Sequence, residues 1–175
     1  MENIRKKNNK KERKVMKKLN LLLMIFFTLF IQKAFSLDND DMIGYWKIPS
    51  GKSIIRIDKE GDSFSGYVVW LKEPVYGKND KESGKAKYDR YNSNKELRNR
   101  PVIGLKVAGN LVLESKTKLK NGWVYDPFHG KKYTGTVEII DKNTIRIRGS
   151  IDKNSFFGYT QECKRVNPLN YVIKN

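Results

Sequence analysis

The chain has 175 residues and is basic, with 36 Lys and Arg residues against 19 Asp and Glu residues. Residues 1–36 hold ten of the basic and two of the acidic residues, so the rest carries 26 against 17, a net charge of +9, which is too small an excess to predict a nucleic-acid partner. The single cysteine excludes an internal disulfide, and the single histidine excludes a multi-histidine metal site.

Residues 1–36 have the pattern of a secretory signal peptide behind a basic N-terminal extension. Lys17-Lys18 precede an apolar run of 13 residues, 19–31, which is shorter than the roughly 20 residues that span a bilayer. The sequence Ala34-Phe35-Ser36 places small residues at the −3 and −1 positions of a cleavage site. We therefore predict an exported protein, periplasmic or secreted, whose domain is residues 37–175. The alternative is an uncleaved N-terminal membrane anchor.

Residues 37–175 consist of short runs rich in β-branched and aromatic residues, separated by Gly, Asp and Asn turns. We predict strands at residues 43–48, 53–58, 64–71, 101–107 with a continuation at 111–114, 122–126, 131–140, 144–151 and 156–166. Residues 116–121 are predicted to be a charged connection, and residues 152–155 a turn. No amphipathic helical repeat interrupts the series.

The hairpin at residues 122–140 is the centre of this pattern. Asp126-Pro127 begins its turn, and Gly130 can take the positive φ that the exit of the turn needs. Alternation along the outgoing strand puts four residues on one face: Tyr133, Gly135, Val137 and Ile139. In the strand at 64–71 the same alternation puts four residues on one face: Phe64, Gly66, Val68 and Trp70.

Residues 72–100 differ from the rest, because they are rich in Lys, Asn, Asp, Ser and Gly. A connection of this length inside a small domain is either a solvated, variable excursion or a functional loop. Residues 94–98 are predicted to form one helical turn, capped by Asn92 or Ser93.

About eight short strands in a meander predict an all-β domain, a single antiparallel up-and-down β-barrel. Closure into a barrel removes the strand edges that would otherwise favour aggregation. A barrel of eight strands is either filled by its own side chains or holds one small ligand.

Five motifs in a fixed order resemble the DUF2147 family of exported bacterial proteins. They are Gly44-Tyr45-Trp46, residues 97–104 (LRNRPVIG), residues 125–133 (YDPFHGKKY), Arg148-Gly149 and residues 157–161 (FGYTQ). The resemblance spans residues 42–166 and implies a lipocalin-like β-barrel. It implies no catalytic residues.

Gly44 and Trp46 also resemble the Gly-x-Trp of the first strand in lipocalins. There an arginine near the end of the barrel covers the tryptophan in a cation–π contact. Arg165 has the corresponding position here.

The aromatic residues of the strands are the candidate lining of a ligand pocket. We predict that the pocket is lined by Trp46, Trp70, Trp123, Tyr125, Tyr133 and Tyr159. Arg98 and Arg100 could clamp a carboxylate or phosphate at its mouth. The alternative is that these two arginines pair with acids of the loop or seal a barrel end.

The first functional hypothesis is therefore an exported barrel that binds a small, largely apolar or amphiphilic molecule in the cell envelope. The alternative is an envelope interaction module with a filled barrel, whose basic surface binds anionic lipid, polysaccharide or a protein partner. An enzyme acting through Asp126 and neighbouring polar groups is a third, weaker hypothesis, and we do not predict an enzyme. The sequence predicts no cofactor and no metal site, and it leaves the oligomeric state open.

Overall fold

The computed structural model describes residues 13–18, 37–151 and 157–171. The chain divides into two compact units, Met1–Ser36 and Leu37–Asn175. In the first unit residues 13–18 are helical, and the predicted cleavage site lies outside the described residues. The turn predicted at 152–155 and the predicted strand start at Phe156 lie outside them too. Within the described ranges, no helix is both long enough and apolar enough to span a bilayer.

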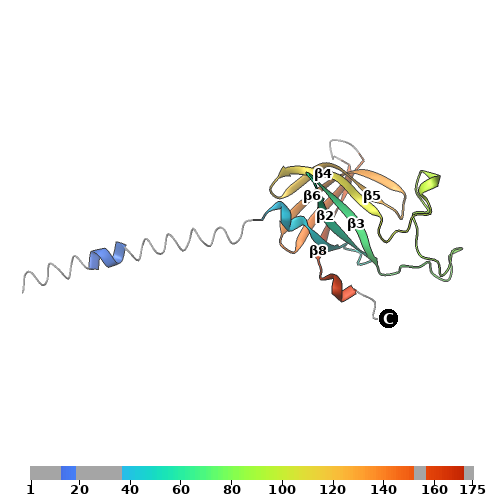
Figure 1. Cartoon of the computed structure of the whole chain (residues 1–175), viewed down its shortest axis with the longest axis horizontal. Helices are drawn as coiled ribbons and strands as arrows, with labels where there is room; N and C mark the ends of the chain where they lie inside the picture. Colours follow the sequence, from blue (N-terminus) through green and yellow to red (C-terminus); the bar gives the residue numbers. More distant parts are fainter. Residues whose placement is uncertain (1–12, 19–36, 152–156, 172–175) are drawn as a thin grey trace, which may run out of the picture. The chain divides into compact units, whose positions relative to one another are not determined.

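The second unit is a closed barrel in which eight antiparallel strands follow one another in chain order (Figure 1). The strands are β1 Gly44–Lys47, β2 Ser53–Glu60, β3 Ser63–Leu71, β4 Lys106–Ser115, β5 Lys118–Asp126, β6 Lys131–Asp141, β7 Thr144–Ser150 and β8 Gly158–Arg165. Three short 3₁₀ helices accompany them, η1 Asn39–Met42, η2 Lys95–Leu97 and η3 Pro168–Tyr171. The predicted up-and-down barrel is confirmed. All eight strands and the residues of the core lie within 37–175, so this unit contains a complete core of its own.

Two predicted breaks are β-bulges inside strands. Asn110 has φ 55° and Asn121 has φ 61°, and at each of them the pairing register shifts against the neighbouring strand. A bulge absorbs one extra residue without ending the strand. The predicted break at 108–110 is therefore wrong, and of the predicted connection at 116–121 only residues 116–117 lie between the strands. The predicted strand start at Pro101 is also wrong, because residues 102–104 form a turn and β4 begins at Lys106.

A third irregularity moves Trp70 off the face predicted for it. Ile54 pairs with Trp70, whereas the adjacent Ile55 pairs with Val68, so Val69 is an extra residue in β3. The extra residue reverses the alternation of side chains beyond it. Trp70 consequently packs outside the barrel, edge-to-face on Tyr171 of η3 with ring centroids 5.1 Å apart.

One end of the barrel is closed by Trp46, which is fully buried, and Arg165. The guanidinium carbon of Arg165 lies 4.2 Å from the centroid of the Trp46 ring. Its nitrogens donate to three backbone carbonyls: Lys142 at 2.7 Å, Ile43 at 3.0 Å, and Asp41. The predicted cation–π contact is confirmed, and the same arginine ties η1 and the β6–β7 turn to the end of the barrel.

The opposite end of the barrel is built differently. The β1–β2 and β5–β6 connections lie there, together with Ile151, Phe157 and the long loop between β3 and β4, residues 72–105. This loop is the green to yellow-green excursion that carries η2 in Figure 1. The cap of η2 is Asn94, whose side chain accepts from the Glu96 amide at 3.0 Å. The predicted cap at Asn92 or Ser93 is thus wrong, because Asn92 accepts from the Asn94 amide instead.

Replacing Arg165 should destabilise the barrel strongly. Arg165→Ala removes three hydrogen bonds to backbone carbonyls and a cation–π contact, and we expect a loss of about 2–4 kcal/mol in the free energy of unfolding. Urea unfolding of residues 37–175 measures this loss. Lys142→Ala is the matched control, because it keeps the carbonyl that accepts from Arg165, and it should change stability by less than about 0.5 kcal/mol. Equal effects of the two substitutions would contradict the role of Arg165.

A cavity in the open half of the barrel

The barrel encloses a cavity of about 1130 Å³ that reaches the open end. Its inner wall is aliphatic and is formed by side chains from six of the strands: Ile55, Ile57, Val68, Leu71, Val107, Leu111, Val124, Val137 and Ile147. Strand ends and connections of the open end form its mouth, including Lys52, Lys72, Phe128, Lys131 and Tyr159. The barrel is therefore hollow, and the filled interior that the alternative function assumed is absent from the described structure.

Three of the eight predicted binding residues line this cavity: Tyr125, Tyr133 and Tyr159. Trp46 belongs to the closed end, and Trp70 packs outside the barrel. Trp123 also faces outward, where the Lys132 ammonium lies 4.3 Å from its ring centroid. That the three tyrosines contact a ligand stays a prediction.

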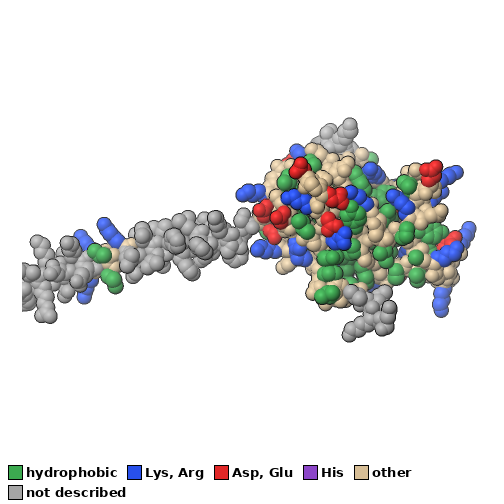
Figure 2. Space-filling view, in the orientation of Figure 1, with side chains coloured by type: hydrophobic (Ala, Val, Ile, Leu, Met, Phe, Trp, Pro, Cys, Tyr) green, Lys and Arg blue, Asp and Glu red, His purple; other side chains and the backbone are tan. Residues whose placement is uncertain are grey.

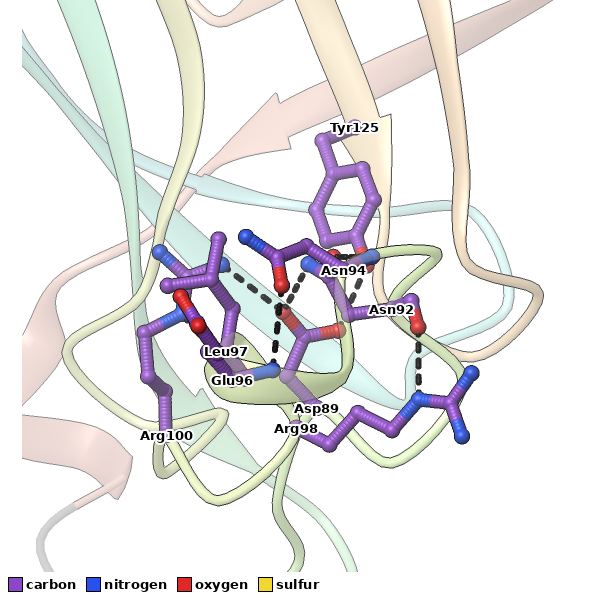
Figure 3. A network of polar contacts seen from close by, with 8 residues as sticks. All are labelled: Asp89, Asn92, Asn94, Glu96, Leu97, Arg98, Arg100 and Tyr125. Carbon is purple, nitrogen blue, oxygen red and sulfur yellow. Dashed lines mark hydrogen bonds and ion pairs between the residues drawn. The ribbon is translucent and has the colours of Figure 1, made fainter.

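Arg98 and Arg100 do not line the cavity either, and instead they hold the long loop in place (Figure 3). A guanidinium nitrogen of Arg100 donates to Asp89 Oδ2 at 2.9 Å. Arg98 Nε donates to the backbone carbonyl of Asn92 at 2.7 Å. Arg100 thus pairs with an acid of its own loop, the alternative left open by the sequence, and neither arginine is placed to clamp a ligand in the cavity.

Asp89 is the centre of this network and is 0% exposed. Besides Arg100, it accepts a hydrogen bond from the Tyr125 hydroxyl at 2.5 Å and one from the Asn92 amide at 2.7 Å. Tyr125 belongs to β5, so these bonds attach the loop to the barrel wall. Because a buried carboxyl group without partners is costly, all three donors are needed to keep Asp89 inside.

Burial raises the pKa of Tyr125 to about 12, and the hydrogen bond to Asp89 contributes to the shift. The neutral phenol is therefore favoured in the folded protein. Tyr125 presents its ring to the cavity while its hydroxyl serves the network. One side chain thus links the loop to the cavity wall.

A second contact fixes the loop against the β5–β6 turn. Gly130 has φ +66°, and a Cβ atom there would lie 1.8 Å from the carbonyl oxygen of Tyr91. Only glycine allows this approach. The loop is consequently held at two points beside the mouth, through Asp89 and through Tyr91.

The charged residues at the mouth were not predicted. Lys52, Lys72, Lys87 and Lys131 line the cavity together with the acids Glu73 and Asp126. The sequence did contain a signal, because each of the four lysines lies within a few residues of a strand end or in the long loop. Strand order alone could not show that these positions meet around one opening.

The remaining side chains with reactive groups are Asp126, His129 and Cys163. Asp126 accepts from the Phe128 amide at 2.9 Å within its own turn, and its Oδ2 lies 2.6 Å from His129 Nδ1. His129 is 72% exposed on its side chain. Cys163 is fully buried, and burial raises the pKa of its thiol to about 12. Among the residues described, no group of His, Cys, Asp and Glu could hold a metal ion.

Comparisons with known proteins agree with the resemblance drawn from the motifs. Residues 44–165 match a family model described as "Uncharacterized protein conserved in bacteria (DUF2147)". The fold is similar to that of protein HP1028 from Helicobacter pylori, which is described as belonging to the lipocalin family. The TM-score is 0.63 at 24% sequence identity, and the match covers 77% of this chain and 90% of that chain. No curated protein matches the sequence significantly.

Removing the Asp89 carboxyl group should release the long loop. Asp89→Ala leaves the Tyr125 hydroxyl and the Asn92 amide without their acceptor, and we expect trypsin to cleave within residues 72–105 about tenfold faster or more. Mass spectrometry of the fragments identifies the cleavage sites. Glu96→Ala, an exposed change in the same loop, should leave the cleavage rate unchanged. Equal rates in wild type and Asp89→Ala would show that the network does not hold the loop.

Tyr125 should also make stability depend on pH in the alkaline range. Its folded pKa is raised from 10.0 to about 12, so its contribution is complete below pH 10 and is lost as the pH rises through about 12. Unfolding free energies measured at several pH values should therefore fall more steeply between pH 10 and 12 in wild type than in Tyr125→Phe. Since the other titrating groups are common to both proteins, parallel curves would rule this coupling out.

Proposed function

This chain belongs to the DUF2147 family, and on that basis we propose that it is an exported lipocalin-like barrel that binds one small, largely apolar molecule in the cell envelope. The observation that carries the proposal is the cavity of about 1130 Å³ with its aliphatic wall. Small-molecule sites typically measure about 300–1,000 Å³ and combine apolar walls with a few polar groups at one side. This cavity has a similar volume, and its charged groups lie at the mouth.

The size and lining of the cavity favour a molecule with an alkyl chain or a comparable apolar body. Each buried methylene contributes about 0.8 kcal/mol, so a chain of about fourteen contributes about 11 kcal/mol. Association costs at least about 4 kcal/mol. The difference corresponds to a dissociation constant in the micromolar range. Such affinity needs no specific polar contact inside the barrel, and the wall offers few.

Export is part of the proposal and rests on residues 1–36, whose basic and apolar segments have the order of a signal peptide.

The proposal includes no catalytic step. Asp126 accepts from the amide of its own turn, and Cys163 lies in the core with a raised thiol pKa. The alternative of a filled barrel acting only through its surface has no support from the interior, which is hollow.

Native mass spectrometry of residues 37–175, purified after export, tests the proposal directly. We expect a non-covalent adduct of small mass that is lost on denaturation. The second measurement is titration with cis-parinaric acid, a fluorescent fatty acid, which reports binding in an apolar site. A protein that carries no adduct and does not bind the fatty acid would contradict the proposal.

A larger side chain in the cavity should weaken this binding without unfolding the barrel. Val137 lines the cavity, whereas Thr136 on the same strand does not. We expect Val137→Trp to weaken cis-parinaric acid binding about tenfold or more. Thr136→Trp is the matched control and should stay within about twofold of wild type. Thermal unfolding of both variants checks that the barrel is folded, and equal affinities would place the ligand elsewhere.

A further inference from the structure

The open end exposes large apolar side chains around the mouth of the cavity. Ile151 is 81% exposed, Phe157 76%, Tyr159 72% and Phe128 42%. All four also line the cavity, so they surround a single opening. Single exposed apolar residues need no explanation, but a contiguous group at the entrance of a cavity indicates an interaction surface.

Lysines lie among these apolar side chains. Lys52, Lys72 and Lys131 line the same opening, and within the described part of the chain none of them has an acidic partner within 4.0 Å. Lys87, the fourth lysine, lies 3.5 Å from Glu73. The long loop beside the mouth adds to the positive charge, since residues 72–105 contain nine Lys and Arg residues and five Asp and Glu residues.

The opposite end of the barrel carries charges of both signs. Its acids include Asp38, Asp40 and Asp41 around η1, Asp62 in the β2–β3 turn and Asp141 at the end of β6. Its basic residues include Lys59, Lys116, Lys142 and Arg165. Figure 2 shows acidic and basic side chains side by side near η1 and on the long loop. The excess of basic residues therefore lies at the opening, where the long loop alone has nine basic and five acidic residues.

We propose that the open end docks on the surface of an anionic lipid bilayer, which deepens the proposed function and rests on it. Aromatic and lysine side chains together are the composition that anchors proteins at membrane interfaces. Lysines close to an anionic bilayer each add about fivefold to the affinity. Docking in this orientation places the mouth against the lipid.

The same orientation explains why the mouth is apolar. An alkyl chain that leaves a bilayer for an aliphatic cavity need not cross bulk water if the opening lies against the membrane. The ligand of this arrangement is therefore a membrane amphiphile, whose chain occupies the cavity and whose head group stays near the lysines. A protein partner would explain the exposed side chains but not their continuity with the cavity.

Vesicle flotation with residues 37–175 tests the inference. The leader is omitted because the apolar run at 19–31 would itself enter lipid. We expect binding to vesicles of equal parts phosphatidylcholine and phosphatidylglycerol, weakened by added salt, and little binding to phosphatidylcholine alone. Failure to bind the anionic vesicles, or equal binding to both kinds, would overturn the inference.

Two triple variants locate the surface. K52Q/K72Q/K131Q removes three charges at the mouth and should weaken binding to anionic vesicles about 100-fold. K59Q/K116Q/K142Q removes three charges from β2 and the turns of the closed end, and should stay within about threefold of wild type. Equal losses in the two variants would show that net charge, not the mouth, attracts the lipid.

Titration with cis-parinaric acid in the absence of vesicles separates this inference from the proposed function. Wild-type protein that binds the fatty acid but no vesicle refutes docking and leaves the cavity function intact. Protein that binds anionic vesicles through the mouth but takes up no fatty acid refutes the cavity function and, with it, ligand transfer from the membrane.

Discussion

The barrel depends on the contact between Arg165 and Trp46, because backbone pairing alone closes it weakly. β1 and β8 pair through only two residue positions, Trp46 with Arg165 and Lys47 with Lys164, whereas the other neighbouring strands share between four and eight. The guanidinium of Arg165 compensates by donating to three carbonyls and covering the indole ring. Gly44 makes room for it, since a Cβ atom there would lie 2.6 Å from an arginine nitrogen.

Because the contact between Trp46 and Arg165 closes the barrel at one end, the other end can remain open. Side chains packed around Trp46 fill the closed end, and the cavity occupies the interior toward the open end. The mouth of the cavity therefore needs interactions other than core packing to keep its shape. The network around Asp89 serves this purpose, because it attaches a long, polar loop to β5 through buried hydrogen bonds.

Much of the fold could be predicted from the sequence because alternation, turn residues and the Gly44–Trp46–Arg165 pattern all act locally or at the ends of strands. The site was harder to predict because alternation fails at bulges. One extra residue at Val69 puts Trp70 outside the barrel. Arg100 looked like an anion clamp only because nothing in the sequence shows that Asp89 is buried beside it. The rim lysines could not be grouped without the register of all eight strands.

The entrance of the cavity and the excess of basic residues lie at the same end of the barrel. Basic residues are in excess at the end that opens, whereas the end sealed by Arg165 carries acids and basic residues together. An apolar cavity gains most from an entrance that avoids water, and a lysine-rich entrance favours an anionic surface over bulk solvent. The hollow interior, the apolar rim and the lysines at the mouth therefore fit one arrangement, the proposed docking of the open end on a lipid surface.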